Sequence, residues 1–232
     1  MKCLIYIFLV FNYILPAQQK DSLKKSPSVL LGINLQPALT GDVLGSYNDG
    51  VATGGKHTLS PRFVLNGGLQ TLIKIRRNWF LNSGVSFTEL GYKEQIIPFL
   101  NYIGEETRNI TYKHYYITAN VLAQYKFKMM YFGLGLNTAH YQISKIIENG
   151  TTVVTKNPIR IGPDFALEST GYWLLGLQAR IGIQLKINNK LYFMPDIFIC
   201  GLRTTSRNFP YYGGGDGFFL TGLNLTLQYK IK

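Results

Sequence analysis

The residues that could bind a metal or act as acid–base catalysts are few in this chain and lie far apart. The sequence has three histidines, His57, His114 and His140, and two cysteines, Cys3 and Cys200. Their spacing matches none of the short patterns of metal sites, and two cysteines are too few for a disulfide framework. We therefore expect no metal site, no cofactor and no disulfide scaffold.

The alternation of side chains along a strand places His114 and His140 on opposite faces of the predicted sheet. If Lys128-Met129 is a two-residue turn, His114 lies on the polar face of its strand, and His140 lies on the apolar face of the next strand, beside Ile117. The two cannot then form a metal pair. Neither histidine has a serine two residues away with a carboxylate behind it, so we expect no enzymatic activity.

One oppositely charged pair can be placed by strand register. If Asn188 to Lys190 form a three-residue turn, position 182 faces position 196, and Arg180 becomes a diagonal neighbour of Asp196 on the polar face. Gly182 leaves room between them. A charge removed from water needs a partner, so we predict a structural Arg180–Asp196 ion pair in a polar interior.

The elements that must position these residues are strands, because apolar and polar side chains alternate along most of the chain. In the last segment, Leu223, Leu225 and Leu227 share one face, and Asn224 and Thr226 share the other. We predict eight strands, at 28–37, 61–75, 79–95, 109–127, 130–145, 170–187, 191–206 and 218–231. Short turns at 76–78, 128–129 and 188–190 alternate with long connections at 38–60, 96–108, 146–169 and 207–217.

Eight alternating strands fit a closed up-and-down barrel. Aromatic residues gather near both ends of the strands, as they do at membrane interfaces, and the polar face would make a poor apolar ligand cavity. We therefore predict an all-β fold: a closed eight-stranded antiparallel up-and-down transmembrane β-barrel. Its apolar side chains face lipid, with short periplasmic turns and long extracellular loops.

Composition and the first residues agree with an exported barrel. Of the 232 residues, 16% are charged and 14% aromatic, which excludes a disordered chain. A basic start, an apolar run from Cys3 to Leu15 and the small residue Ala17 have the pattern of a secretory signal peptide. We predict a signal peptide at 1–17, a periplasmic stub at 18–27 and an outer-membrane barrel domain at 28–232.

The formal net charge of +12 gathers at the short-turn end of the predicted barrel. Asp21 is the only acid there, and the charges of the rest of the exported chain cancel. Nucleic-acid binding would need basic residues along a groove with stacking aromatics, so we expect none. A basic periplasmic rim suits anionic lipid headgroups instead. Its residues are Lys74, Arg76, Arg77, Lys126, Lys128, Lys186, Lys190, Lys230 and Lys232.

Several segments are similar to the PorT-like family of outer-membrane proteins, small eight-stranded barrels of the OmpA/OmpX type found in diderm bacteria with a type IX secretion system. The segment from Tyr116 to Tyr125 resembles the fourth strand of that family, Gly32-Ile33-Asn34 its first strand and Leu191 to Asp196 its seventh. The resemblance implies an eight-stranded barrel without one shared activity, because only some members serve type IX secretion.

These features together indicate a monomeric, non-catalytic structural or surface-interaction protein of the cell outer membrane. Its partners would be outer-membrane lipids and, in addition, a protein in the periplasm or at the extracellular loops. Three alternatives stay open: an accessory component of a secretion system, a lipid-modifying enzyme of the outer membrane, and a secreted lipocalin-like barrel that binds a small apolar ligand.

Overall fold

The computed structural model describes the chain at residues 28–42, 47–49, 55–98, 107–156, 159–161, 167–169, 173–204 and 217–231. The predicted signal peptide at 1–17, the stub at 18–27 and Lys232 lie outside these residues. For His57, only the backbone is described.

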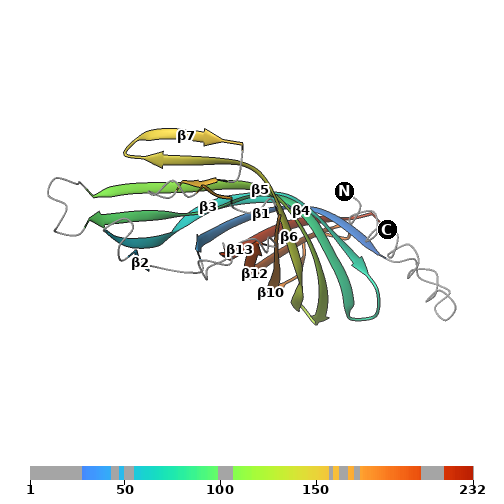
Figure 1. Cartoon of the computed structure of the whole chain (residues 1–232). Helices are drawn as coiled ribbons and strands as arrows, with labels where there is room; N and C mark the ends of the chain where they lie inside the picture. Colours follow the sequence, from blue (N-terminus) through green and yellow to red (C-terminus); the bar gives the residue numbers. More distant parts are fainter. Residues whose placement is uncertain are drawn as a thin grey trace.

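Eight long strands close into an antiparallel barrel, as the sequence predicts (Figure 1). Strands that follow one another around the barrel pair with each other, and the last pairs with the first to complete the ring. The part of the chain that the structure describes contains no helix long and apolar enough to cross a membrane. The eight strands are β1 (Val29–Asp42), β3 (Gly55–Lys74), β4 (Trp79–Pro98), β5 (Arg108–Phe127), β6 (Met130–Glu148), β10 (Trp173–Ile183), β12 (Leu191–Thr204) and β13 (Gly217–Lys230).

The strand ends at the short turns agree with the prediction to within one residue, apart from β10, which ends at Ile183 and is continued by a separate short strand. Phe127 pairs with Met130 across the two-residue turn at Lys128-Met129. The short β11 (Leu185–Lys186) continues the line of β10 along β12, and beyond it the amide of Ile187 donates to the carbonyl of Leu191 at 3.0 Å. The three-residue turn predicted at 188–190 is therefore present.

Several strands run further than predicted at the opposite end. β1 continues through Pro37 to Asp42, and β3 begins at Gly55 rather than at residue 61. Proline normally ends a strand because it lacks an amide hydrogen. Here Pro37 lies at a gap in the β1–β13 register, and Pro61 borders a register shift between β3 and β4, so neither position needs that hydrogen.

The connection predicted at 146–169 contains a hairpin. β6 continues to Glu148, and β7 (Thr151–Thr155) returns along it. Between them Asn149 and Gly150 have positive φ values of 45° and 86°, as tight hairpin turns require. The short β8 (Ile159–Ile161) and β9 (Leu167–Ser169) pair with each other, and β2 (Tyr47–Asp49) pairs with β3.

The wall of the barrel has opposite polarity on its two faces. Along β3, Leu69 is 66% exposed and its neighbour Gln70 is 3% exposed; along β10, Leu177 is 63% exposed and Gln178 is 3% exposed. The same alternation recurs along the other barrel strands. Apolar side chains therefore point outward and polar ones point inward, which is the reverse of a soluble barrel.

Side chains fill the interior in three layers. A polar layer, which includes Asn34, Gln178 and Asn224, lies in the middle. The interior is therefore less polar than predicted, because apolar and aromatic side chains fill much of both ends. Buried polar side chains such as Glu94 and His114 still lie among them at the long-connection end. The cluster at the long-connection end includes Leu90, Tyr116, Leu174, Phe198 and Phe218, and the cluster at the short turns consists of Leu30, Leu72, Tyr131 and Met194 with Phe80 and Tyr192 packed against it.

Candidate functional site

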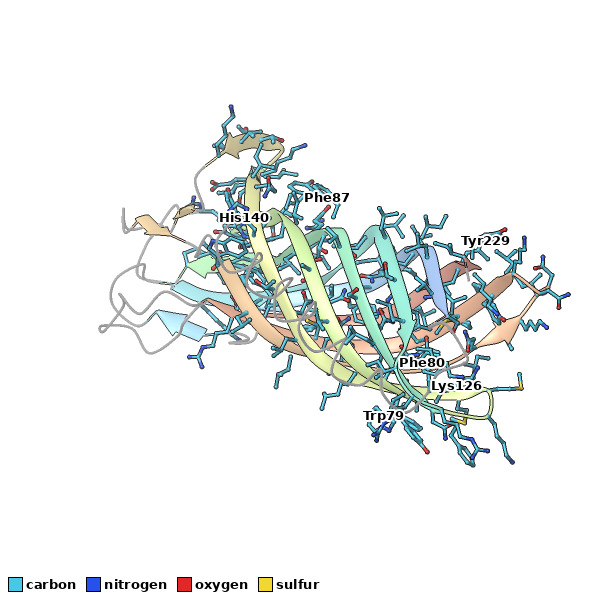
Figure 2. The ribbon with its side chains drawn as sticks, turned by 90° about the vertical axis from the view of Figure 1, so that its right-hand side faces the viewer. Trp79, Phe80, Phe87, Lys126, His140 and Tyr229 are labelled. Carbon is cyan, nitrogen blue, oxygen red and sulfur yellow. The ribbon has the colours of Figure 1, made fainter. Side chains whose placement is uncertain are left out.

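An apolar band with aromatic side chains at both ends covers the outer surface of the barrel (Figure 2). Near the short turns, Trp79 packs edge-to-face on Tyr125 with 5.1 Å between ring centroids. At the other end, His140 packs on Trp173 at 4.5 Å. Outward-facing leucine, isoleucine and valine side chains lie between these pairs. Most of the exposed surface of the strands is thus apolar, with amphipathic rings at its edges.

Some aromatic residues near the strand ends, however, belong to the interior. Each of them neighbours an outward-facing residue in sequence, so the alternation turns it inward. These residues strengthen the packing of the barrel and add nothing to its outer surface. They are Phe80, Tyr131 and Tyr192 at the short turns and Tyr92, Tyr141 and Phe218 at the opposite end.

Arg180 and Asp196 both lie in the polar layer, and each is only 4% exposed. The register that the sequence predicts is present, because Gly182 pairs with Asp196. Oδ2 of Asp196 accepts hydrogen bonds from the hydroxyl of Tyr131 and from the amide of Asn224, both at 2.7 Å.

The hydrogen bonds of Arg180 go to a different neighbour. With its amide oxygen turned toward the guanidinium, Gln178 accepts from Nε and Nη2 of Arg180, both at 3.2 Å. Ion-pair contacts among the described residues include those of Arg62 with Glu89 and of Arg108 with Glu148. Arg180 and Asp196 attract each other across the polar layer. The two residues thus share the predicted layer and register. Their hydrogen bonds, however, go to neutral side chains and not to each other.

His114 and Ser144 form a contact that sequence reasoning missed. Nδ1 of His114 lies 2.6 Å from Oγ of Ser144, which also accepts a hydrogen bond from the hydroxyl of Tyr141 at 2.9 Å. All three side chains are buried, at 1%, 0% and 3% exposure. Ser144 and His114 therefore resemble the first two members of a catalytic triad in distance but lie within the packed interior.

This contact arises from a β-bulge. The two-residue turn at 128–129 by itself would place His114 opposite Ile143, but the register shifts by one residue at Tyr115 and Tyr116, which brings Ser144 opposite. The orientation predicted for the histidines is confirmed, since His114 faces inward and His140 pairs with Ile117 on the outside. A bulge has no clear sequence signature here, so the alternation alone could not reveal the contact.

Metal ligands and reactive thiols are scarce in the described part of the chain. It contains no group of three or more His, Cys, Asp or Glu residues that could hold a metal ion. Cys200 is a free, buried cysteine, and its sulfur accepts a hydrogen bond from the amide of Asn137 at 3.3 Å. Its environment is that of a small core side chain.

The predicted basic rim gathers at the short-turn end, apart from Lys232, which lies outside the described residues. Its side chains differ in exposure. Lys126 reaches inward, where its ammonium group donates to the buried amide oxygen of Gln184. The exposed members are Lys74, Arg76, Arg77, Lys128, Lys186 and Lys190, and the partly buried ones are Lys126 and Lys230.

Some rim lysines occupy positions in the inward-facing rows of the strands. Each of them pairs in register with an inward residue of the short-turn cluster. The basic charges therefore surround the mouth of the barrel above a floor of aromatic and aliphatic side chains. The register pairs are Lys74 with Phe80, Lys126 with Tyr131, Lys186 with Tyr192 and Lys230 with Leu30.

The ladder between β3 and β4 is interrupted in the half of the barrel nearer the long connections. Pro61 pairs with Tyr92, and the next pair is Gly67 with Phe87, so the backbone between these pairs lacks regular partners across this ladder. An unsatisfied backbone amide is costly in a wall that faces lipid. Side chains must therefore replace the missing bonds.

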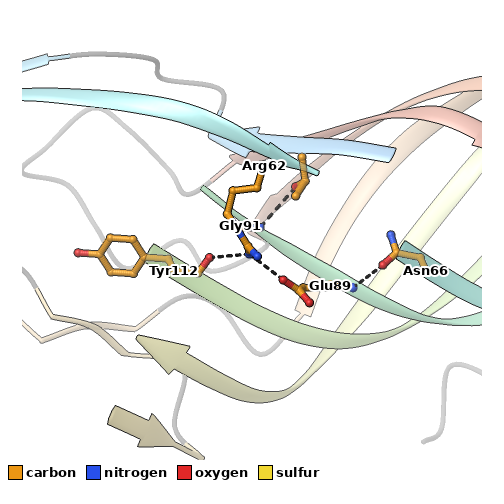
Figure 3. Close-up of polar contacts among 6 residues, drawn as sticks. Arg62, Asn66, Glu89, Gly91 and Tyr112 are labelled. Atoms are coloured by element: carbon orange, nitrogen blue, oxygen red, sulfur yellow. Dashed lines mark hydrogen bonds and ion pairs between the residues drawn. The ribbon is translucent and has the colours of Figure 1, made fainter. Parts of the chain in front are cut away.

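Polar side chains from three strands close this interruption (Figure 3). Oδ1 of Asn66 accepts from the amide of Glu89 at 2.8 Å, and the amide of Gly91 donates to Oγ1 of Thr40 at 3.4 Å. Arg62 donates to the carbonyl of Tyr112 at 3.2 Å and pairs with the Glu89 carboxylate at 2.7 Å. The interruption is thus sealed by hydrogen bonds and one ion pair.

The fold and its outer surface together define the class of the protein. Exposed apolar surface of this extent is unfavourable in water and favourable in hydrocarbon. A closed barrel is also one of the two structures that satisfy every backbone group within a bilayer. The chain is therefore a transmembrane β-barrel.

Comparison with known proteins finds solved outer-membrane proteins that are similar to this chain at low sequence identity. Neisserial surface protein A has a TM-score of 0.47 and 9% identity over 89% of this chain and 100% of its own. AlkL, solved in DMPC lipid bilayers, has a TM-score of 0.44 and 14% identity over 92% and 98%. Ail of Yersinia pestis has a TM-score of 0.37 and 12% identity over 87% and 98%. No protein-family model and no curated protein matches the chain. Because these TM-scores lie below 0.5, the class rests on the registers and burial of this chain.

Proposed function

We propose that this chain is an integral barrel of the bacterial outer membrane with a structural or surface-interaction role, and that it is a PorT-like protein. The observation that carries the proposal is the polarity of the wall, with Leu177 exposed and Gln178 buried at adjacent positions. The same polarity disfavours the secreted lipocalin-like alternative, because such a barrel needs its apolar face inside.

The orientation follows from the lengths of the connections. Short turns face the periplasm and long connections face outward in barrels of this class. The apolar run at the start of the sequence serves as the export signal. In this orientation the basic rim faces the periplasm, where each Lys or Arg near an anionic membrane surface contributes about 1 kcal/mol. Lipids of the inner leaflet are thus the first partners that we propose for the rim, and the barrel works as a monomer.

A non-catalytic role is supported by the environment of the one Ser–His contact. Ser144 is 0% exposed and His114 is 1% exposed, so a substrate could reach neither without unpacking the barrel. On the lipid face, His140 contacts Trp173 and Gln142 rather than a serine. Acyl release from lipopolysaccharide tests the lipid-modifying alternative: wild type and His140→Ala should both be inactive, and activity lost in the variant would establish an enzyme.

The proposal is tested by fractionation and by detergent dependence. We expect the full chain to appear in the outer-membrane fraction, to lose residues 1–17 and to resist extraction by alkaline carbonate. The purified protein should aggregate without detergent and insert into phosphatidylcholine vesicles with its strands protected from protease. A chain that stays monodisperse without detergent would overturn the membrane assignment. Co-purification with secretion components would instead favour the accessory role in secretion.

A further inference from the structure

Lysine side chains gather on the outer face of the barrel just beyond the aromatic end of the apolar band. They are Lys93 on β4, Lys113 on β5 and Lys145 on β6, which we call the outer lysine cluster. Lys93 and Lys145 are exposed and Lys113 is partly buried. The cluster lies at the long-connection end, opposite the basic rim, and no role described above involves it.

The register brings the three charges close together. Lys113 pairs directly with Lys145 across β5 and β6, and Lys93 pairs with Thr111, which makes it a diagonal neighbour of Lys113. Directly opposed side chains in a sheet have Cβ atoms about 5 Å apart, and like charges at this distance are destabilising. An anion placed between the ammonium groups would turn this repulsion into attraction.

Two acidic side chains of this region are engaged elsewhere. Glu89 lies nearest in register, and its carboxylate pairs with Arg62 at 2.7 Å. Glu148 pairs with Arg108, and among the described residues neither carboxylate is in ion-pair contact with the cluster. The positive charge of the cluster is thus not neutralised by these carboxylates.

The cluster continues directly into the apolar band. Tyr115 lies two residues from Lys113 on the same face, and its ring stacks on Phe87 with 5.7 Å between centroids. Nζ of Lys145 lies 5.6 Å from the centroid of the Tyr115 ring, so the ammonium group and the aromatic ring are in contact. Below Tyr115, Val85 and Ile117 are 52% and 46% exposed on the same face. A molecule bound here would meet cations, then aromatic rings, then aliphatic side chains.

We propose that the outer lysine cluster binds the phosphate groups of an outer-leaflet lipid, whose acyl chains lie along the apolar band below Phe87 and Tyr115. Ammonium groups donate strong, charge-assisted hydrogen bonds to phosphate oxygens. The order of cations, amphipathic rings and aliphatic side chains matches the order of headgroup, interface and chains in a phosphorylated lipid. The proposal rests on the proposed function, because it needs the long connections to face outward and this wall to face lipid.

The test measures the retention of diphosphoryl lipid A by native mass spectrometry of the full chain in a neutral detergent. Lys113→Gln with Lys145→Gln removes the central pair. Lys56→Gln with Arg203→Gln removes two exposed charges from other strands at the same end. Each basic residue near a charged lipid surface changes the affinity by about fivefold to tenfold. We therefore expect the first variant to bind diphosphoryl lipid A at least about tenfold more weakly than wild type does. The control variant should bind as wild type does.

Two further measurements show whether the cluster binds the phosphate groups of a lipid or a free phosphate anion. Lipid A without its phosphates should bind as weakly to wild type as diphosphoryl lipid A binds to the cluster variant, and inorganic phosphate should not compete at millimolar concentration. Equal affinity for the phosphorylated and dephosphorylated lipids, or an equal loss in both variants, would overturn the proposal. Competition by inorganic phosphate would indicate a free-anion site and would also overturn it. If wild type does not insert into vesicles, the proposed function falls as well; if it inserts but ignores the phosphates, this inference alone is wrong.

Discussion

Asp196 illustrates how a barrel keeps a charge in its interior. Its carboxylate accepts two hydrogen bonds of 2.7 Å, from Tyr131 and Asn224, and the charge of Arg180 acts on it from the same layer. The sequence predicts the layer because both charges fall on the polar face at a register fixed by the turn at 188–190. The partners could not be predicted, because the choice among amide and hydroxyl neighbours depends on side-chain rotamers.

Replacing Asp196 with alanine should destabilise the barrel strongly. The change removes two hydrogen bonds and leaves the Arg180 guanidinium buried without a compensating charge, which costs about 3 kcal/mol in the free energy of unfolding. Urea unfolding of the vesicle-inserted protein, followed by tryptophan fluorescence, measures this cost. The matched control is Glu148→Gln, which removes an acid from the partly exposed Arg108–Glu148 pair and should cost less than about 1 kcal/mol. Equal costs in the two variants would contradict the account.

At the scale of elements, the strands show which sequence signals are dependable. Apart from the break after Ile183, the ends at the short turns could be predicted to within one residue because each turn is bounded by clear alternation. The extensions of β1 and β3 could not, since Pro37 and Pro61 read as strand ends. The hairpin at Asn149-Gly150 did carry a signal, because Asn-Gly between apolar runs is typical of a tight turn. The sealed interruption of the β3–β4 ladder had none, because it depends on the side chains of three strands.

Close contact between β10 and β12 should make Gly176 intolerant of any side chain. A Cβ atom at this position would lie 1.7 Å from the carbonyl oxygen of Gly201, whereas a Cβ on Gly201 would meet nothing within 4 Å. We expect Gly176→Ala to lower the free energy of unfolding by about 2 kcal/mol or more and Gly201→Ala to change it by less than about 0.5 kcal/mol. The same urea titration compares the two. A harmless Gly176→Ala would show that the strands do not approach as closely as described.

The seal of the β3–β4 interruption should respond to loss of the Asn66 amide. Asn66→Leu leaves the amide of Glu89 without its acceptor, and an unsatisfied buried donor costs about 1–3 kcal/mol. Hydrogen exchange at the Glu89 amide should accelerate by about tenfold or more. The amide of Val85, in the regular ladder of the same strand, is the internal control and should exchange as in wild type. Unchanged exchange at Glu89 would mean that Asn66 does not seal the wall.

At the scale of the whole molecule, one wall serves two environments. The outward face offers hydrocarbon an apolar band with aromatic edges, the inward face packs three layers of side chains, and the two ends carry separate groups of basic residues. The basic rim surrounds the mouth at the short turns, and the outer lysine cluster lies beyond the band at the other end. Sequence alternation predicted two different faces because period two is a direct consequence of strand geometry, and the aromatic strand ends and polar second face predicted which of them points outward. It missed the apolar ends of the interior because inward-facing aromatics look the same in sequence as interfacial ones.

The central claim is that the apolar face of the barrel wall points outward. Paramagnetic relaxation of leucine methyl groups by doxyl-labelled lipids tests it most directly, because the measurement compares leucines on the outer and inner faces of the wall. In vesicles containing the labelled lipid, the methyl signals of Leu223 and Leu227, which are 48% and 39% exposed, should broaden strongly. Those of Leu174 and Leu220, which are 0% and 4% exposed, should stay sharp. Broadening of the second pair with protection of the first would place the apolar face inside and contradict the account.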